Sequence, residues 1–131
     1  TLFLDEIGDM PASLQAKILR VVQDQTFERV GGNETIQTHV RVIAATNQDL
    51  PKLMAEGRFR KDLFYRLNAI TIQVPPLRQR LADVAELAHY FLFRFNRELK
   101  MDMRGIAPEV LEIFQAYSWP GNVRELQGAV K

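Results

Sequence analysis

Two apolar runs in this 131-residue sequence end in polar residues whose chemistry suits a nucleotide site. Asp5 and Glu6 follow the first run, and Thr46 and Asn47 follow the second. Ligands bind just outside the carboxyl ends of strands in open parallel α/β sheets, so both pairs can border one site. Adjacent carboxylates suit a Mg²⁺-nucleotide, because one holds the metal or its water and the other orients the attacking water. The alternative is that Asp5 and Glu6 are solvated loop acids.

A second candidate is Arg124, near the end of the sequence. We expect Asn122 to be a helix N-cap, with Glu125 as its reciprocal partner in a variant of the capping box. This arrangement puts Arg124 in the first turn, where the helix dipole disfavours a cation. A phosphate would relieve the conflict, because free N–H groups and the guanidinium could both face it. The alternative is that the long side chain of Arg124 extends into solvent.

A third candidate is the cationic segment of residues 57–66, in which charged residues alternate with an apolar stripe. Phosphoryl transfer needs positive charge at the γ-phosphate, and an arginine from a neighbouring subunit is a common source. Arg60 and Arg66 are six residues apart. They would therefore lie roughly 120° apart on a straight helix and approach a phosphate differently. The alternative is a basic face in solvent.

A parallel sheet with flanking helices is needed to hold these groups. Short apolar or alternating runs predict strands at residues 2–4, 40–45 and 70–74, and a hairpin is expected around residues 31–33. A helix is expected from about Pro11. Its spacing assigns Leu14, Ile18, Val21 and Val22 to the buried face, and Gln15, Lys17, Arg20 and Asp24 to the surface.

The pattern changes after Pro75-Pro76. Before it, Asp49 is expected to cap a short helix that Gly57 ends, and a helix with a buried stripe from Phe59 to Leu67 follows. From Asp83 onward apolar residues recur at helical spacing, with further helices expected from Pro108 and Val123. We therefore expect an α/β fold: a partial parallel sheet with flanking helices in residues 1–76, and a small all-helical subdomain in residues 77–131.

Composition excludes several classes of protein. The apolar share of 47% and the charged share of 25% are those of a globular domain, and the net charge of +1 offers no global attraction for nucleic acid. The absence of cysteine excludes disulfides and thiolate metal sites, and it fits the reducing cytoplasm in which we expect the protein. No apolar run is long enough to cross a bilayer, so we expect no membrane partner.

Taken in order, these segments resemble the AAA+ central domain of NtrC-like activators of the sigma-54 RNA polymerase. The likeness runs nearly from end to end. Thr1–Glu6 resembles a Walker B strand, Ala44–Asn47 the end of a sensor I strand, Gly57–Asn68 an arginine-finger helix, and Trp119–Leu126 a sensor II helix; Phe27–Gly32 and Val74–Arg78 match as well.

The resemblance implies roles for the strand-end residues. Asp5 would hold the Mg²⁺-bound water, and Glu6 would polarise the water that hydrolyses ATP. Asn47, with Thr46 beside it, would sense the γ-phosphate. The implied cofactors are therefore ATP and Mg²⁺, as in other AAA+ ATPases.

The resemblance also implies how subunits and partners meet. Arg60 and Arg66 would act in trans on the ATP of the adjacent subunit, and Arg124 would contact the nucleotide in cis from the lid. The family, which includes bacterial two-component response regulators, forms rings, commonly hexamers. It uses hydrolysis to remodel the sigma-54 holoenzyme and open promoters.

The sequence departs from the family pattern in several ways. It contains no G-x-x-x-x-G-K-[ST] phosphate-binding loop, and the family's sigma-contacting loop, regulatory domain and DNA-binding domain are also missing. Contact with promoter-distal DNA is therefore expected only through an absent C-terminal domain. Gln79 stands where Glu is usual, and Ala107 where a capping Ser or Thr is usual; we expect both to be tolerated. We expect an excised fragment that neither binds ATP tightly nor hydrolyses it alone.

Two other interpretations compete with the ATPase fragment. One is a helical interaction module whose acids and arginines only keep it in solution, and the other is a different AAA+ branch, such as a chelatase or clamp loader. The polar strand ends and Arg124 argue against a pure interaction module, which would not require them. The run of residues 59–68 favours the activator branch.

Overall fold

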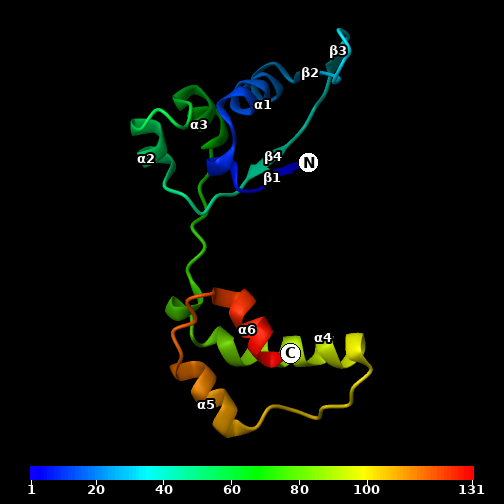
Figure 1. Ribbon diagram of the computed structural model, residues 1–131, viewed down its shortest axis with the longest axis vertical. Helices are drawn as coiled ribbons and strands as arrows, with labels where there is room; N and C mark the ends of the chain where they lie inside the picture. Colours follow the sequence, from blue (N-terminus) through cyan, green and yellow to red (C-terminus); the bar gives the residue numbers. More distant parts are fainter. The chain divides into compact units, whose positions relative to one another are not determined.

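The computed structural model describes all 131 residues and divides them into two compact units, unit 1 (Thr1–Thr71) and unit 2 (Ile72–Lys131) (Figure 1). The expected α/β class is confirmed, with a parallel strand pair and flanking helices in unit 1 and only helices in unit 2. Unit 1 contains β1 (Leu2–Leu4), the 3₁₀ turn η1 (Ile7–Asp9), α1 (Ala12–Asp24), β2 (Thr26–Glu28), β3 (Thr35–Gln37), β4 (Val42–Ala44), α2 (Leu50–Ala55) and α3 (Lys61–Leu67). Unit 2 contains η2 (Leu77–Gln79), α4 (Asp83–Leu99), α5 (Pro108–Ala116) and α6 (Asn122–Val130).

The strands of unit 1 form two separate pairs. β1 and β4 are parallel, with Leu2 opposite Val42 and Leu4 opposite Ala44, although a helix and a hairpin separate them in the chain. β2 and β3 form the expected antiparallel hairpin. Because β1 and β4 end at the same level, the loops that follow them begin side by side.

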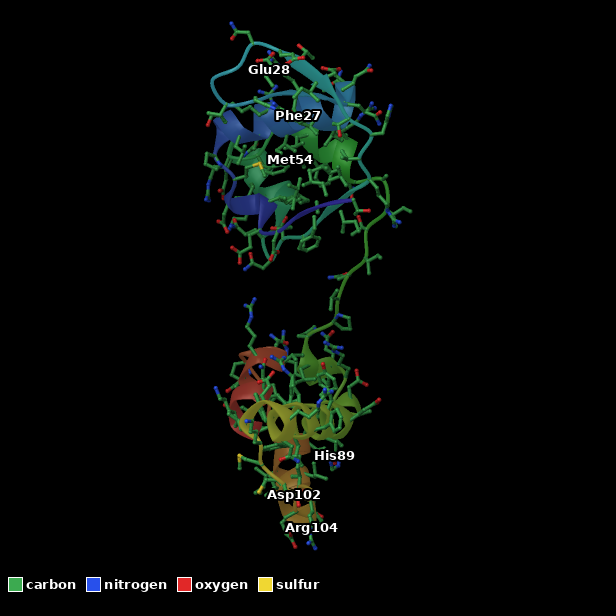
Figure 2. The ribbon with its side chains drawn as sticks, turned by 90° about the vertical axis from the view of Figure 1, so that its right-hand side faces the viewer. Phe27, Glu28, Met54, His89, Asp102 and Arg104 are labelled. Carbon is green, nitrogen blue, oxygen red and sulfur yellow. The ribbon has the colours of Figure 1, made fainter.

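An apolar core joins the helices of unit 1 to one face of the β1–β4 pair. Its buried members are Ile7, Leu53, Phe59 and Leu63, and the strand residues Leu4 and Ala44 pack against them. Helix α3 packs against α1 and β4. Met54 also joins this core, and Figure 2 shows its sulfur among the side chains of unit 1.

Helix α1 corrects one expectation from the sequence. Gln15, assigned to the surface, is fully buried, whereas Leu14, assigned to the buried face, is 42% exposed. Gln15 is buried because its amide forms hydrogen bonds with backbone groups of two other segments. Amphipathic spacing does not reveal this, because it counts Gln as a surface residue.

The strand expected at residues 70–74 is not formed. Ile70, Ile72 and Val74 are 85%, 83% and 73% exposed, and the segment pairs with no other strand. Alternating apolar residues become a strand only when a neighbouring strand accepts their backbone hydrogen bonds. The β1–β4 pair does not extend to this segment.

Unit 2 has its own core, built on the buried face of α4. Val84, Ala88, Phe91 and Phe95 recur at the predicted helical spacing and pack with Leu77, Trp119 and Leu126. Trp119 is 3% exposed, and its indole N–H donates a hydrogen bond to the carbonyl of Phe114 at 2.7 Å. Helix α5 buries no residue fully, and the apolar side chains of Val110 and Tyr117 are 37% and 46% exposed.

None of the helices combines the length and apolar character that a bilayer crossing requires.

Candidate nucleotide site

The loops that follow β1 and β4 bring together four of the candidate residues. The backbone N–H of Ile7 donates to the carbonyl of Ala45 at 3.0 Å, and the N–H of Ala45 donates to the carbonyl of Leu4 at 2.8 Å. These bonds continue the strand pairing beyond the strands. They place the Asp5–Glu6 pair beside the Thr46–Asn47 pair, and all four side chains are exposed.

Gly8 lets the two loops approach closely. A Cβ atom at this position would lie 2.8 Å from Thr46 Oγ and 3.0 Å from Gln48 Cβ, both closer than van der Waals contact allows. The Gln48 side chain also donates a hydrogen bond to the Asp9 carboxylate, and its backbone N–H donates to Thr46 Oγ at 3.1 Å. Gly8, Asp9 and Gln48 are not among the candidate residues predicted from the sequence. A glycine just after a strand that ends in acids was the available signal.

Glu6 has an unusual backbone conformation. Its φ of 53° and ψ of 43° lie in the left-handed region, which side chains other than Gly, Asn and Asp seldom occupy. The Asp5 carboxylate accepts a hydrogen bond from the Glu6 N–H at 3.0 Å, which supports this turn. Residues held in such conformations concentrate at functional sites. The turn fixes the direction in which the Glu6 carboxylate leaves the backbone.

The donor chemistry of this site fits a metal that arrives with a nucleotide. Mg²⁺ in phosphate-transfer sites takes one or two carboxylates and completes its shell with water and substrate phosphates. Asp5 and Glu6 provide such a pair, and no group of three or more His, Cys, Asp or Glu residues could hold a metal by itself. Asp5 is the candidate metal ligand, acting through a water. One of its carboxylate oxygens already accepts a hydrogen bond from the Glu6 backbone N–H.

Arg60 lies at the start of α3, where it is the N-cap residue. Its guanidinium forms a two-pronged ion pair with Asp62, with N–O distances of 3.0 and 2.7 Å. The hydrogen bond to Asp62 raises the pKa of Arg60, and the same bond lowers the pKa of Asp62. Both side chains are about half exposed, so Arg60 is ionised and reachable from solvent.

Arg66 lies in the last turn of α3, also exposed and in no ion pair. Arg60 and Arg66 thus occupy opposite ends of one short helix.

Arg124 lies in unit 2, exposed in the first turn of α6. The cap of this helix differs from the one expected. Gly121 is the N-cap residue, and its N–H donates to the Glu125 carboxylate at 2.7 Å. Asn122, whose backbone is left-handed with φ of 54°, instead accepts a hydrogen bond from the Leu77 N–H at 2.9 Å. Tyr117 also donates to the Glu125 carboxylate, and this bond raises the pKa of Tyr117.

Comparison with known families accounts for nearly the whole chain. Residues 1–73 match the family described as "Sigma-54 interaction domain", and residues 78–131 match the family described as "AAA+ ATPase lid domain".

Curated relatives match over the full length of the chain. The regulatory protein AtoC of Escherichia coli is 51% identical over 131 residues, which are all of this chain and 28% of AtoC. The nitrogen fixation protein VnfA of Azotobacter vinelandii is 50% identical, and the match covers 25% of VnfA. The chain therefore spans about a quarter of the length of these relatives.

Solved structures show the same fold. NtrX from Brucella abortus in complex with ADP is 45% identical, with a TM-score of 0.91; the match covers 98% of this chain and 29% of that one. NtrX in complex with ATP matches with a TM-score of 0.89.

Proposed function

Since this chain belongs to the sigma-54 interaction domain family of AAA+ proteins, we propose that it forms the part of an ATPase that runs from Walker B to sensor II. A protein that contains it hydrolyses ATP and uses the energy to remodel the sigma-54 RNA polymerase holoenzyme and open promoters. The observation that carries the proposal is the pair of interlocked loops that presents Asp5 and Glu6 beside Thr46 and Asn47.

The strand-end residues divide the work of hydrolysis. Asp5 would hold Mg²⁺ through a water, and the metal would supply positive charge against the phosphates. Glu6 orients and polarises the attacking water; its side chain is exposed and leaves the chain at the left-handed turn after β1. Asn47, supported by Thr46, contacts the γ-phosphate and distinguishes ATP from ADP.

The arginines contribute from two directions. Arg60 and Arg66 act on the ATP of the adjacent subunit in a ring of six subunits. There they stabilise charge on the transferred phosphoryl group. Arg124 acts on the ATP of its own subunit, from the first turn of the lid helix α6. ATP binding by NtrX, a relative of the same fold, supports the nucleotide as ligand.

The 131-residue chain by itself lacks the backbone cradle and the lysine of a phosphate-binding loop. We therefore propose that it neither binds ATP tightly nor turns it over. Turnover measured on the purified chain, at a rate comparable to that of the protein described next, would contradict this.

The test uses a protein in which these 131 residues follow a phosphate-binding loop, here called the loop-bearing protein. Its ATPase rate is compared with that of Glu6→Gln, which keeps the size of the side chain but removes the carboxylate. We expect turnover to fall by at least about a thousandfold. The matched control is Glu112→Gln, the same change at an exposed position of α5, which should leave the rate unchanged.

Two outcomes would overturn the proposal. One is a loop-bearing protein that forms rings and shows no turnover. The other is a Glu6→Gln variant as active as Glu112→Gln. Activity on the polymerase is measured separately, as ATP-dependent opening of a sigma-54 promoter by the holoenzyme. Promoter opening by Glu6→Gln at the unmodified rate would separate the remodelling function from hydrolysis.

A further inference from the structure

Gln15 is the one fully buried polar side chain of the chain, and it binds three backbone groups. Its amide nitrogen donates to the carbonyl of Met10 at 2.8 Å and to the carbonyl of Arg58 at 2.9 Å. Its amide oxygen accepts the backbone N–H of Arg60 at 2.9 Å. Both donor hydrogens and the acceptor are thereby used, and the bonds reach from α1 to a segment more than forty residues away.

These bonds hold the segment that leads into α3. Arg60 is the N-cap residue of that helix, and its own side chain accepts no hydrogen bond from the first turn. The Arg60 N–H points into the core of unit 1, where Gln15 is its partner, while the guanidinium lies half exposed on the outside. The main chain of Arg60 is therefore held by Gln15 on one side and by the helix on the other.

The Met10 contact ties the same amide to the strand-end site. Met10 follows η1, and its N–H donates to the carbonyl of Ile7, the residue directly after Glu6. One side chain thus connects the loop that carries the catalytic acids of a subunit to the backbone of Arg60.

We propose that Gln15 is a positioning residue that sets the backbone of Arg60, so that its guanidinium reaches the ATP of the adjacent subunit. This inference rests on the proposed function, specifically on the action of Arg60 in trans. Gln15 touches neither nucleotide nor metal. Its effect passes through Arg60, since a small displacement of a charged group at a transition state is enough to lose much of its effect.

The first readout is steady-state kinetics of the loop-bearing protein. Gln15→Leu removes both kinds of hydrogen bond, and we expect kcat to fall about tenfold to a hundredfold, with KM for ATP within about twofold of the unmodified value. Gln15→Met keeps the length and approximate volume of the side chain, so it serves where the branched leucine unfolds the protein. The control for general loosening of the core is Leu19→Ala, a truncation on the same helix against the same cluster.

The decisive readout is subunit mixing. A Gln15→Leu subunit has intact acids but a displaced Arg60, whereas a Glu6→Gln subunit has an inert site but a well-placed Arg60. In an equimolar mixture, we expect turnover to rise well above the sum of the two separate preparations, to roughly a quarter of the unmodified rate, because half of the competent sites gain an intact arginine from a neighbour. Leu19→Ala mixed with Glu6→Gln should show no such rise.

The same experiment separates the two levels of inference. Arg60→Ala mixed with Glu6→Gln should also regain activity. If that mixture recovers and the Gln15 mixture does not, the positioning role is overturned and the proposed function stands. If neither mixture recovers, Arg60 does not act in trans, so the positioning role and that part of the proposed function are overturned, while the ATPase role is decided by the Glu6→Gln comparison. Loss of activity in Gln15→Leu and Leu19→Ala alike, with no recovery of either on mixing, would show that Gln15 contributes only to folding.

Discussion

The strand-end loops and the arginine segment of unit 1 are held in place by different means. The loops after β1 and β4 are held by backbone hydrogen bonds that continue the strand register, and by a glycine that allows close approach. The segment before α3 is held by one side chain, Gln15, which belongs to another helix. The acids proposed to serve a subunit's own ATP thus lie on loops held by the strand pair. The arginine proposed to serve a neighbour's ATP is fixed by a tertiary contact that one substitution can remove.

The largest effect is expected from removing the arginine itself. In the loop-bearing protein, Arg60→Ala should lower kcat by about a thousandfold or more and leave KM for ATP nearly unchanged, because a finger arginine acts on the transition state. The measurement is the steady-state ATPase rate at saturating ATP. Arg29→Ala, a truncation of an exposed arginine after β2, is the control and should change neither constant. An equal loss of kcat in both variants would show that the effect comes from the change in net charge and not from the position of Arg60.

Gly8→Ala tests the interlocking of the loops directly. The added methyl group would lie 2.8 Å from Thr46 Oγ and 3.0 Å from Gln48 Cβ, so the Thr46 side chain or one of the loops must shift. We expect the free energy of unfolding to fall by about 1–3 kcal/mol, as for other overpacked positions. Denaturant unfolding of the 131-residue chain measures this. Gly105→Ala is the matched control, since no atom lies within 4 Å of its added methyl group. If Gly105→Ala lowers the free energy of unfolding as much as Gly8→Ala does, close approach of the two loops does not explain the loss.

Glu6→Gly separates strain from chemistry at one residue. Glycine occupies the left-handed region without penalty, so we expect the free energy of unfolding to rise by up to about 1 kcal/mol, while turnover of the loop-bearing protein is lost. Glu6→Gln should lose turnover without the gain in stability. A Glu6→Gly variant less stable than Glu6→Gln would show that the turn carries no strain.

The smallest effect concerns the ion pair that Arg60 forms with Asp62. The pKa of Asp62 is lowered by the hydrogen bond from Arg60, so the carboxylate stays ionised until the pH falls below the ordinary range for Asp. Any stabilisation from the pair is present above that range and disappears as the pH falls through the lowered pKa. Carboxyl titration by NMR should show the pKa of Asp62 move back up in Arg60→Ala. An unchanged pKa would mean that Asp62 is governed by its own helix terminus instead.

The sequence was sufficient where local pattern and tertiary structure agree. The apolar runs predicted β1 and β4 and the meeting of the polar residues that follow them, because strand ends of a parallel pair meet at one edge; the nucleotide site itself stays a prediction. Local rules also predicted the hairpin, the Asp49 cap of α2 and the apolar stripe of α3, because here too the local pattern agrees with the tertiary structure.

The misses share a physical cause, since each depends on a partner far along the chain. Gln15 is buried because backbone groups of Arg58 and Arg60, more than forty residues along the chain, bond to its amide. Residues 70–74 alternate like a strand but have no neighbouring strand to pair with. Asn122 bonds to Leu77 instead of capping its own helix. Spacing within a segment carries no information about such partners.

Trp119 has a practical consequence for measurement. It is the only tryptophan of the chain, and it is buried in unit 2, edge-on to the rings of Phe114 and Tyr117. Its fluorescence emission therefore reports on the packing of unit 2, the lid, and not on the strand pair of unit 1. Comparing fluorescence with circular dichroism during denaturation would show whether the two units melt in one transition or two. The molecule thus carries its own label for watching the lid separately from the strand-end site.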